Sequence, residues 1–123
     1  MEGQKSDYQD LYSKFMDEYS KNPVGGAEVG EIIAKMAHFF AKYNLLTAAY
    51  ERELNKKSAE IESGIDDKTG KPISSTKAKV MTSATDEYNN HLINRTHLQN
   101  IEQYINALKS LQKGLLNEYS HMS

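Results

Sequence analysis

The residues of this chain that could carry chemistry are few, and none of them completes a catalytic pattern. Ser74 and Lys77 have the Ser-x-x-Lys spacing that pairs a nucleophile with a base in some acyl-transfer enzymes. The companion motifs of those enzymes are absent from the chain, and a serine at this place also predicts the N-cap of a helix. The chain has no cysteine, which excludes cysteine nucleophiles, disulfides and thiolate metal sites. We therefore expect a protein that is not an enzyme and has no catalytic residue.

The spacing of the histidines does not predict a metal site. His91 and His97 stand six residues apart, which places them on different faces of a helix. No two histidines have the His-x-x-x-His spacing that brings two ligands to one helical face. We predict no metal and no cofactor, and a protein that works by binding other macromolecules.

Apolar residues recur with helical periodicity in three segments, which predicts an all-α fold. A short helix is expected over Asp7–Lys21, where six apolar side chains fall on one face and Ser6 or Asp7 can cap the first turn. Pro23 and the two glycines that follow it end this helix. A long helix is expected over residues 27–63, with apolar steps of four and three residues that give the 3.5-residue period of a coiled-coil seam. This row comprises Val29, Ile33, Met36, Phe40, Tyr43, Thr47, Tyr50, Leu54, Lys57 and Ile61.

A turn at residues 64–74 separates this helix from a third one, predicted from Ser74 or Ser75 to about residue 119. The turn favours a glycine at positive φ, and Ile65 and Ile73 are placed to pair across it as a small hairpin. The third helix is predicted to be continuous, with Arg95 near the seam of a polar middle part. Its predicted apolar stripe comprises Val80, Met81, Ala84, Tyr88, Leu92, Leu98, Ile101, Ile105, Leu108, Leu111, Leu115 and Tyr119.

These helices predict a single helical domain, 1–123, with a short helix and linker in residues 1–26 and a long antiparallel, coiled-coil-like hairpin in residues 27–119. At 1.5 Å per residue the two long helices would measure about 55 and about 65 Å, more than a compact domain of this size holds. The hydrophobic content of 38% and mean hydropathy of −0.71 suit a narrow seam. The end of the third helix is expected to meet the short helix, through Leu111, Leu115, Leu116 and Tyr119 against Tyr8, Tyr12 and Phe15.

Two features predict how the protein meets its partners. Ile32, Phe39 and Leu46 widen the stripe of the second helix beyond what one neighbour covers, so we predict a homo-oligomer with these residues at its interface. Residues 52–79 hold seven basic against five acidic residues, whereas residues 1–20 have a net charge of −3, and this asymmetry indicates an anionic partner. The predicted nucleic-acid contacts are the basic residues Arg52, Lys56, Lys57, Lys77 and Lys79.

This layout resembles the recombination mediator proteins of T-even phages and the small helical-hairpin proteins encoded near phage recombination genes. The similar residues are 43–46, 50–54 and 56–57, then 75–80 with Asp86, and the Leu/Ile-rich segment 105–116. The resemblance implies a ring of hairpins that binds single-stranded DNA and helps to load a recombinase. It also implies that Arg52, Lys56 and Lys57 stand where that family has DNA-binding basic residues, although the family's Lys-x-Arg spacing is not reproduced.

Two other classes of protein remain open. One is a phage-encoded inhibitor of a host nuclease or defence complex, because such proteins are often small and helical. The other is a secreted helical-hairpin protein, although the Trp-x-Gly turn of that class is missing here because the chain has no tryptophan. The polar first residues and the lack of an apolar run of about 20 residues lead us to expect a cytoplasmic protein without a membrane partner, in the host cytoplasm if it is phage-encoded.

Overall fold

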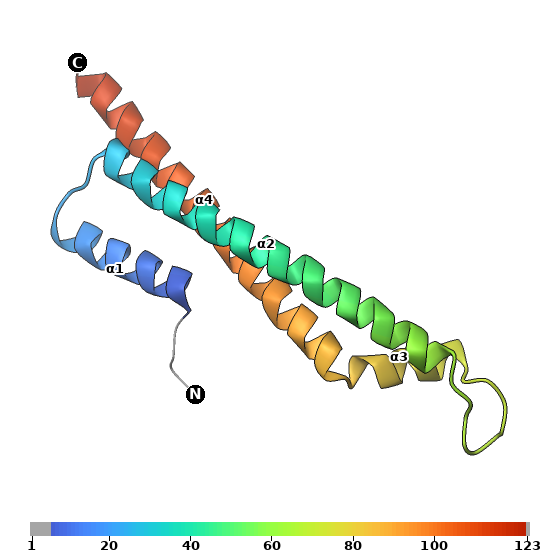
Figure 1. The fold of residues 1–123 in the computed structure, drawn as a ribbon. Helices are drawn as coiled ribbons and strands as arrows, with labels where there is room; N and C mark the ends of the chain where they lie inside the picture. Colours follow the sequence, from blue (N-terminus) through green and yellow to red (C-terminus); the bar gives the residue numbers. More distant parts are fainter. Residues whose placement is uncertain (1–5, 123) are drawn as a thin grey trace. The chain divides into compact units, whose positions relative to one another are not determined.

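The computed structural model describes the backbone of residues 6–122 and the side chains of residues 6–117. These residues form four α-helices (Figure 1): α1 (Asp7–Lys21), α2 (Gly26–Glu62), α3 (Ser75–Ser83) and α4 (Asp86–Met122). The described residues form no strand, and α2 packs against α4 as in a hairpin, so the all-α prediction is confirmed. No helix in the described part is both long enough and apolar enough to cross a bilayer.

The chain divides into two compact units. Unit 1 comprises Met1–Lys42 and Gln99–Ser123, and unit 2 comprises Tyr43–Leu98. The long helices α2 and α4 each contribute residues to both units.

The short helix α1 has the bounds that its apolar spacing predicts. Ser6 is its N-cap, and the side-chain oxygen of Gln9 accepts hydrogen bonds from the backbone N–H of Ser6 at 3.0 Å and from its hydroxyl at 2.9 Å. The two acidic residues of the first turn, Asp7 and Asp10, lie where the positive end of the helix dipole favours them. The cap therefore fixes where this helix begins.

The 3.5-residue row predicted on α2 is confirmed. All ten of its positions are buried or half-buried, and Val29 and Met36 are fully buried. Even Lys57, the charged member of the row, is half-buried, because its aliphatic stem can cover apolar surface while the ammonium stays in water.

Unit 1 has a closed core to which all three of its helical segments contribute. Its buried side chains are Tyr8, Phe15, Val29, Met36, Ile101 and Leu108. Tyr12 stacks on Tyr104 with ring centroids 4.1 Å apart, and the Tyr8 ring lies 5.8 Å from the same Tyr104. Near Gln112 the backbone of α2 approaches α4 closely, since the Gln112 side-chain amide donates to the Gly26 carbonyl at 3.0 Å.

The predicted partners of α1 on the last helix are partly wrong. Tyr8 and Tyr12 meet Tyr104, and the Asn100 amide lies 3.4 Å from the Tyr8 hydroxyl, whereas Leu116 is exposed and lies beside Gly26. Two aromatic rings of α1 thus pack on an aromatic ring of α4. The Tyr119 side chain lies outside the described residues.

The single helix predicted from Ser74 or Ser75 to residue 119 is wrong, because the chain breaks at residues 84–85 into α3 and α4. The amides of Ala84 and Thr85 bond to carbonyls three residues earlier, which tightens the end of α3. The Thr85 hydroxyl then accepts the amide of Tyr88 at 3.2 Å and so caps α4. Thr85 followed by Asp86 and Glu87 is an N-terminal helix signal that the sequence does contain.

The turn between α2 and α3 closes as a single antiparallel bridge. Ile65 pairs with Pro72 and not with the predicted Ile73, while Gly70 has the expected positive φ of 67°. The Asp66 amide donates to the Lys71 carbonyl at 2.8 Å, which closes the loop. Ser74 caps α3 by accepting the Lys77 amide at 3.2 Å, so this serine has a structural role.

The stripe predicted on the last helix is confirmed after Leu98 and wrong before it. Val80, Met81, Tyr88 and Leu92 are all exposed. Arg95 is also exposed and does not lie in the seam. On α4 the covered positions before Leu98 are polar instead, as described below.

Burial in unit 1 yields a prediction with a matched control. Leu108 is 1% exposed and Leu116 is 57% exposed on the same helix. Leu108→Ala should lower the free energy of unfolding by about 2–5 kcal/mol, because it leaves a cavity. Leu116→Ala should lower it by about 1 kcal/mol or less. Urea unfolding of both variants at one protein concentration measures the difference, and equal losses would contradict the assignment of the core.

Candidate interaction surface

Unit 2 buries little of its apolar surface. Ala78 is the only buried side chain among residues 43–98, whereas unit 1 has six buried apolar side chains among its described residues. Most exposed large apolar residues also belong to unit 2. They are Leu45, Ile65, Val80, Met81, Tyr88, Leu92 and Ile93. Exposed apolar groups that gather in one part of a chain mark a surface that another molecule covers.

Three of these side chains share one side of α4. Tyr88 is 38% exposed, and Leu92 and Ile93 are each 46% exposed. At 100° per residue the three span an arc of about 140° around the helix. We call Tyr88, Leu92 and Ile93 the apolar strip.

The opposite, covered side of this part of α4 is polar. Glu87, His91 and Asn94 are half-buried and continue, in steps of three and four residues, the row that Leu98 and Ile101 form further along the helix. One carboxylate oxygen of Glu87 is buried without a hydrogen-bond partner among the described residues. A buried polar atom without a partner costs stability. The first half of α4 therefore has its polar residues inside and its apolar residues outside.

Three polar side chains of α3 and α4 have hydrogen bonds to the backbone of their own helix. The Thr96 hydroxyl donates to the Leu92 carbonyl at 2.9 Å, and the Asn94 amide donates to the Asn90 carbonyl at 2.8 Å. The Ser83 hydroxyl likewise donates to the Val80 carbonyl at 2.8 Å. A hydroxyl such as that of Thr96, which is already bonded within its helix, costs less to remove from water than an unpaired one.

The interface residues predicted from the sequence lie elsewhere. Ile32, Phe39 and Leu46 are each half-buried in the single chain. Phe39 faces a pocket that it lines together with Leu11 of α1, so α1 already lies next to this part of α2. A role of these three residues in an oligomer stays a prediction.

The five basic residues predicted to bind nucleic acid differ in their surroundings. Lys57 pairs with Glu60 at 3.8 Å, and Lys77 pairs with Asp66 at 2.8 Å. The remaining three are exposed and form no ion pair among the described residues: Arg52, Lys56 and Lys79. Lys79 lines a pocket with Leu54, Asn55, Ser58 and Glu62 of α2, so the fold brings it beside that helix.

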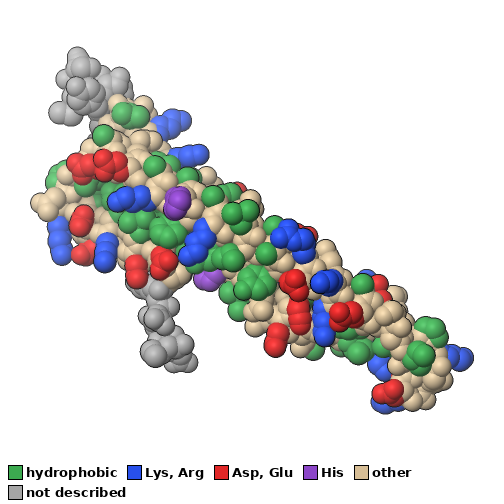
Figure 2. Space-filling view, in the orientation of Figure 1, with side chains coloured by type: hydrophobic (Ala, Val, Ile, Leu, Met, Phe, Trp, Pro, Cys, Tyr) green, Lys and Arg blue, Asp and Glu red, His purple; other side chains and the backbone are tan. Residues whose placement is uncertain are grey.

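The charge of unit 2 as a whole is balanced. Residues 43–98 contain eight basic and eight acidic side chains. On the face shown in Figure 2, basic and acidic side chains alternate over this part of the chain. The excess of basic residues at 52–79 is therefore diluted by the acidic residues on either side.

The ion pair between Asp66 and Lys77 organises the loop between α2 and α3. The hydrogen bond from the Lys77 ammonium, with a second one from the Lys68 amide at 2.9 Å, lowers the pKa of Asp66 below its ordinary value of 3.8. Only 14% of the Asp66 side chain is exposed. Both residues of the Ser-x-x-Lys spacing therefore have structural partners. The Lys77 ammonium pairs with Asp66, and the Ser74 hydroxyl caps α3.

The histidines of unit 2 do not come together with other metal ligands. No group of three or more His, Asp or Glu side chains forms a potential metal site among the described residues. His97 lies against Tyr43 with ring centroids 5.1 Å apart, and burial lowers its pKa. This histidine contributes an aromatic contact between α2 and α4 within unit 2.

Comparison of the chain with protein families, with curated proteins and with solved structures found no match.

The lowered pKa of Asp66 yields a prediction for the loop. The stabilisation from its ion pair should be complete above pH 3.8 and be lost as the pH falls through the lower pKa of the folded state. In an NMR titration, the Lys68 amide should report a midpoint below 3.8, because it donates to the Asp66 carboxylate.

Lys77→Gln should raise that midpoint, whereas Lys71→Gln, an exposed lysine of the same loop, should leave it nearly unchanged. An unchanged midpoint in Lys77→Gln would show that the ion pair does not set the pKa of Asp66.

Proposed function

We propose that the protein is a non-enzymatic binding protein that forms homo-oligomers, and that the apolar strip of unit 2 joins its copies. The observation that carries this proposal is the inverted first half of α4, where Tyr88, Leu92 and Ile93 are exposed and Glu87, His91 and Asn94 are covered. When a partner covers the apolar side that this helix exposes in the single chain, the free energy of the system falls, because apolar surface leaves water.

A second copy suits this surface for an electrostatic reason. Because unit 2 carries equal numbers of acidic and basic residues, two copies of it do not repel each other through net charge. A two-fold axis places the same patch on both partners, so acidic side chains of unit 2 in one copy can meet basic side chains in the other. Leu45, Val80 and Met81 offer further exposed apolar area in the same unit.

Replacing the strip should separate the copies. Leu92→Gln with Ile93→Gln removes two apolar anchors without adding charge, and the oligomer should dissociate to the chain mass of 13.9 kDa. Light scattering coupled to size exclusion, at micromolar concentration and across dilution, measures the mass.

The matched control is Asn90→Gln with Asn106→Gln, which changes two exposed residues of the same helix. It should keep the mass of the unmodified protein. An unmodified protein of 13.9 kDa at every concentration would refute the proposal, as would a strip variant that stays oligomeric.

Single-stranded nucleic acid is a second candidate partner, supported by the three exposed basic side chains that form no ion pair among the described residues. Arg52, Lys56 and Lys79 are free to neutralise phosphates, but three contacts in one copy give weak binding. An oligomer would multiply them, so affinity would depend on assembly. A recombination mediator or accessory of the phage type, as the resemblance implies, would need both properties.

Charge reversal tests the nucleic-acid candidate. Arg52→Glu with Lys56→Glu should abolish binding of a labelled oligonucleotide, measured by fluorescence anisotropy, and binding by the unmodified protein should fall steeply with salt. The control variant carries Lys109→Glu and Lys113→Glu, which replace two exposed lysines of unit 1. It should bind the oligonucleotide as the unmodified protein does.

If the intact oligomer does not bind at low salt, nucleic acid is excluded. A protein partner other than a second copy, such as the target of a phage inhibitor, then becomes the better interpretation of the exposed surfaces.

A further inference from the structure

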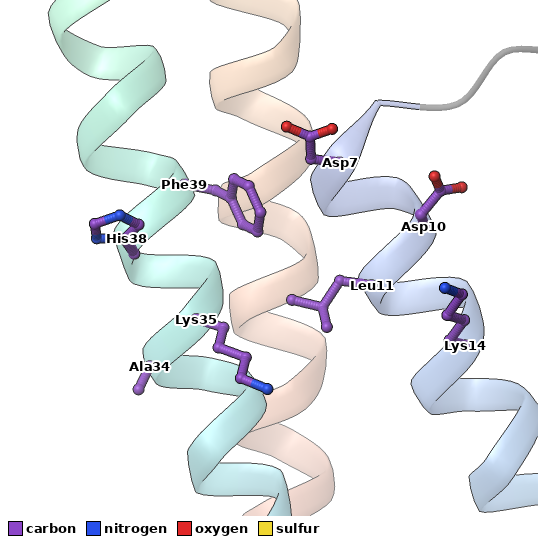
Figure 3. Close-up of a pocket in the computed structure, with 8 residues that line it drawn as sticks. All are labelled: Asp7, Asp10, Leu11, Lys14, Ala34, Lys35, His38 and Phe39. Carbon is purple, nitrogen blue, oxygen red and sulfur yellow. The ribbon is translucent and has the colours of Figure 1, made fainter.

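A pocket lies in unit 1 between α1 and α2, and none of the residues that line it is used in the proposed function. Its volume is about 660 Å³, within the range of small-molecule sites. Figure 3 shows the side chains that line it, four from each helix: Asp7, Asp10, Leu11, Lys14, Ala34, Lys35, His38 and Phe39.

Two lysines line this pocket from opposite helices. Figure 3 shows the Lys35 side chain of α2 reaching toward α1 below Leu11, and the Lys14 side chain on α1 with its ammonium level with Leu11. Neither ammonium forms an ion pair among the described residues. Two cations that line one pocket repel each other, and an anion between them turns this repulsion into attraction.

The acidic residues of the pocket leave the lysines available. Asp7 pairs with Lys42 at 3.7 Å, outside the set of lining residues, so its charge is already balanced. Asp10 stands four residues before Lys14, a spacing that permits an ion pair, yet the two do not approach within 4.0 Å. Among the described residues, one carboxylate and two ammonium groups of the pocket therefore have no ion-pair partner.

An apolar section adjoins the two ammonium groups. The Leu11 side chain of α1 and the Phe39 ring of α2 point toward each other across the groove in Figure 3. Both are half-buried, so a ligand that covers them removes apolar surface from water. The pocket thus combines a cationic part with an apolar part.

We propose that this pocket binds an organic anion with an apolar body, of the class of medium-chain carboxylates. The carboxylate accepts hydrogen bonds from the ammonium groups of Lys14 and Lys35, and the chain lies along Leu11 and Phe39. Asp10, one helical turn before Lys14 on α1, disfavours a second anionic group beside it and limits the ligand to a single negative end.

Titration calorimetry with decanoate, 1-decanol and inorganic phosphate tests both parts of the site on the full chain. Decanoate should bind, and the neutral alcohol and the purely ionic phosphate should each bind at least about tenfold more weakly. Lys14→Gln with Lys35→Gln should weaken decanoate binding about five- to tenfold, since exposed charge pairs each contribute little.

The control Lys109→Gln with Lys113→Gln removes two exposed lysines of the same unit and should bind decanoate as the unmodified protein does. Circular dichroism before titration establishes that each variant is folded. The proposal is overturned if decanoate does not bind, if decanol binds as well as decanoate, or if the Lys14/Lys35 variant binds unchanged. Signals of the Leu11 methyl groups should shift with decanoate, and shifts confined to unit 2 would place the ligand on the apolar strip instead.

Discussion

The structure depends on one seam, in which a row of α2 with a 3.5-residue period meets a row of α4 whose composition changes along the helix. From Leu98 onward the α4 row is leucine and isoleucine, and unit 1 closes a core around Ile101 and Leu108. Before Leu98 the row is polar, and unit 2 buries a single alanine side chain. The same pair of helices therefore supplies a self-sufficient core in one unit and an incomplete one in the other. The exposed apolar residues of unit 2 are the counterpart of its polar seam.

Local periodicity and capping residues made the helices predictable from the sequence. They did not predict which side of the first half of α4 faces α2. The bounds of α1 and the row on α2 follow from spacing alone, because steps of three or four residues meet an apolar side chain everywhere except at Thr47 and Lys57. In the first half of α4, two rows of side chains could face α2. One row is apolar and contains Tyr88 and Leu92, and the other is polar and continues from Leu98 through Asn94 to Glu87. Hydrophobic patterning predicts that the apolar row faces α2. In the structure the polar row faces α2, because it continues the row that Leu98 begins. The break at Thr85 was readable from the capping signal that follows it.

The candidate sites also combine features that the sequence shows with contacts that only the fold shows. The exposed lysines could be named from the sequence, but their pairing could not, because Lys77 meets Asp66 only after the loop between them has closed. Lys14 and Lys35 belong to different helices with no local spacing that joins them, so only the fold shows that they line one pocket. Charge counted along the chain therefore overstated the basic character of the hairpin, where two of the five predicted cations are already neutralised.

The contacts that close unit 1 join distant parts of the chain, and this orders events during synthesis. The hydrogen bond between Asn100 and Tyr8 spans 92 positions, and that between Gln112 and Gly26 spans 86. Unit 2 comes from one continuous segment, so a ribosome completes it while the partners of α1 are still being made. The nascent chain thus exposes the apolar residues of unit 2 before the core of unit 1 is complete. If the copies join through the apolar strip as proposed, neighbouring nascent chains on one polysome would associate through residues 43–98 before unit 1 folds.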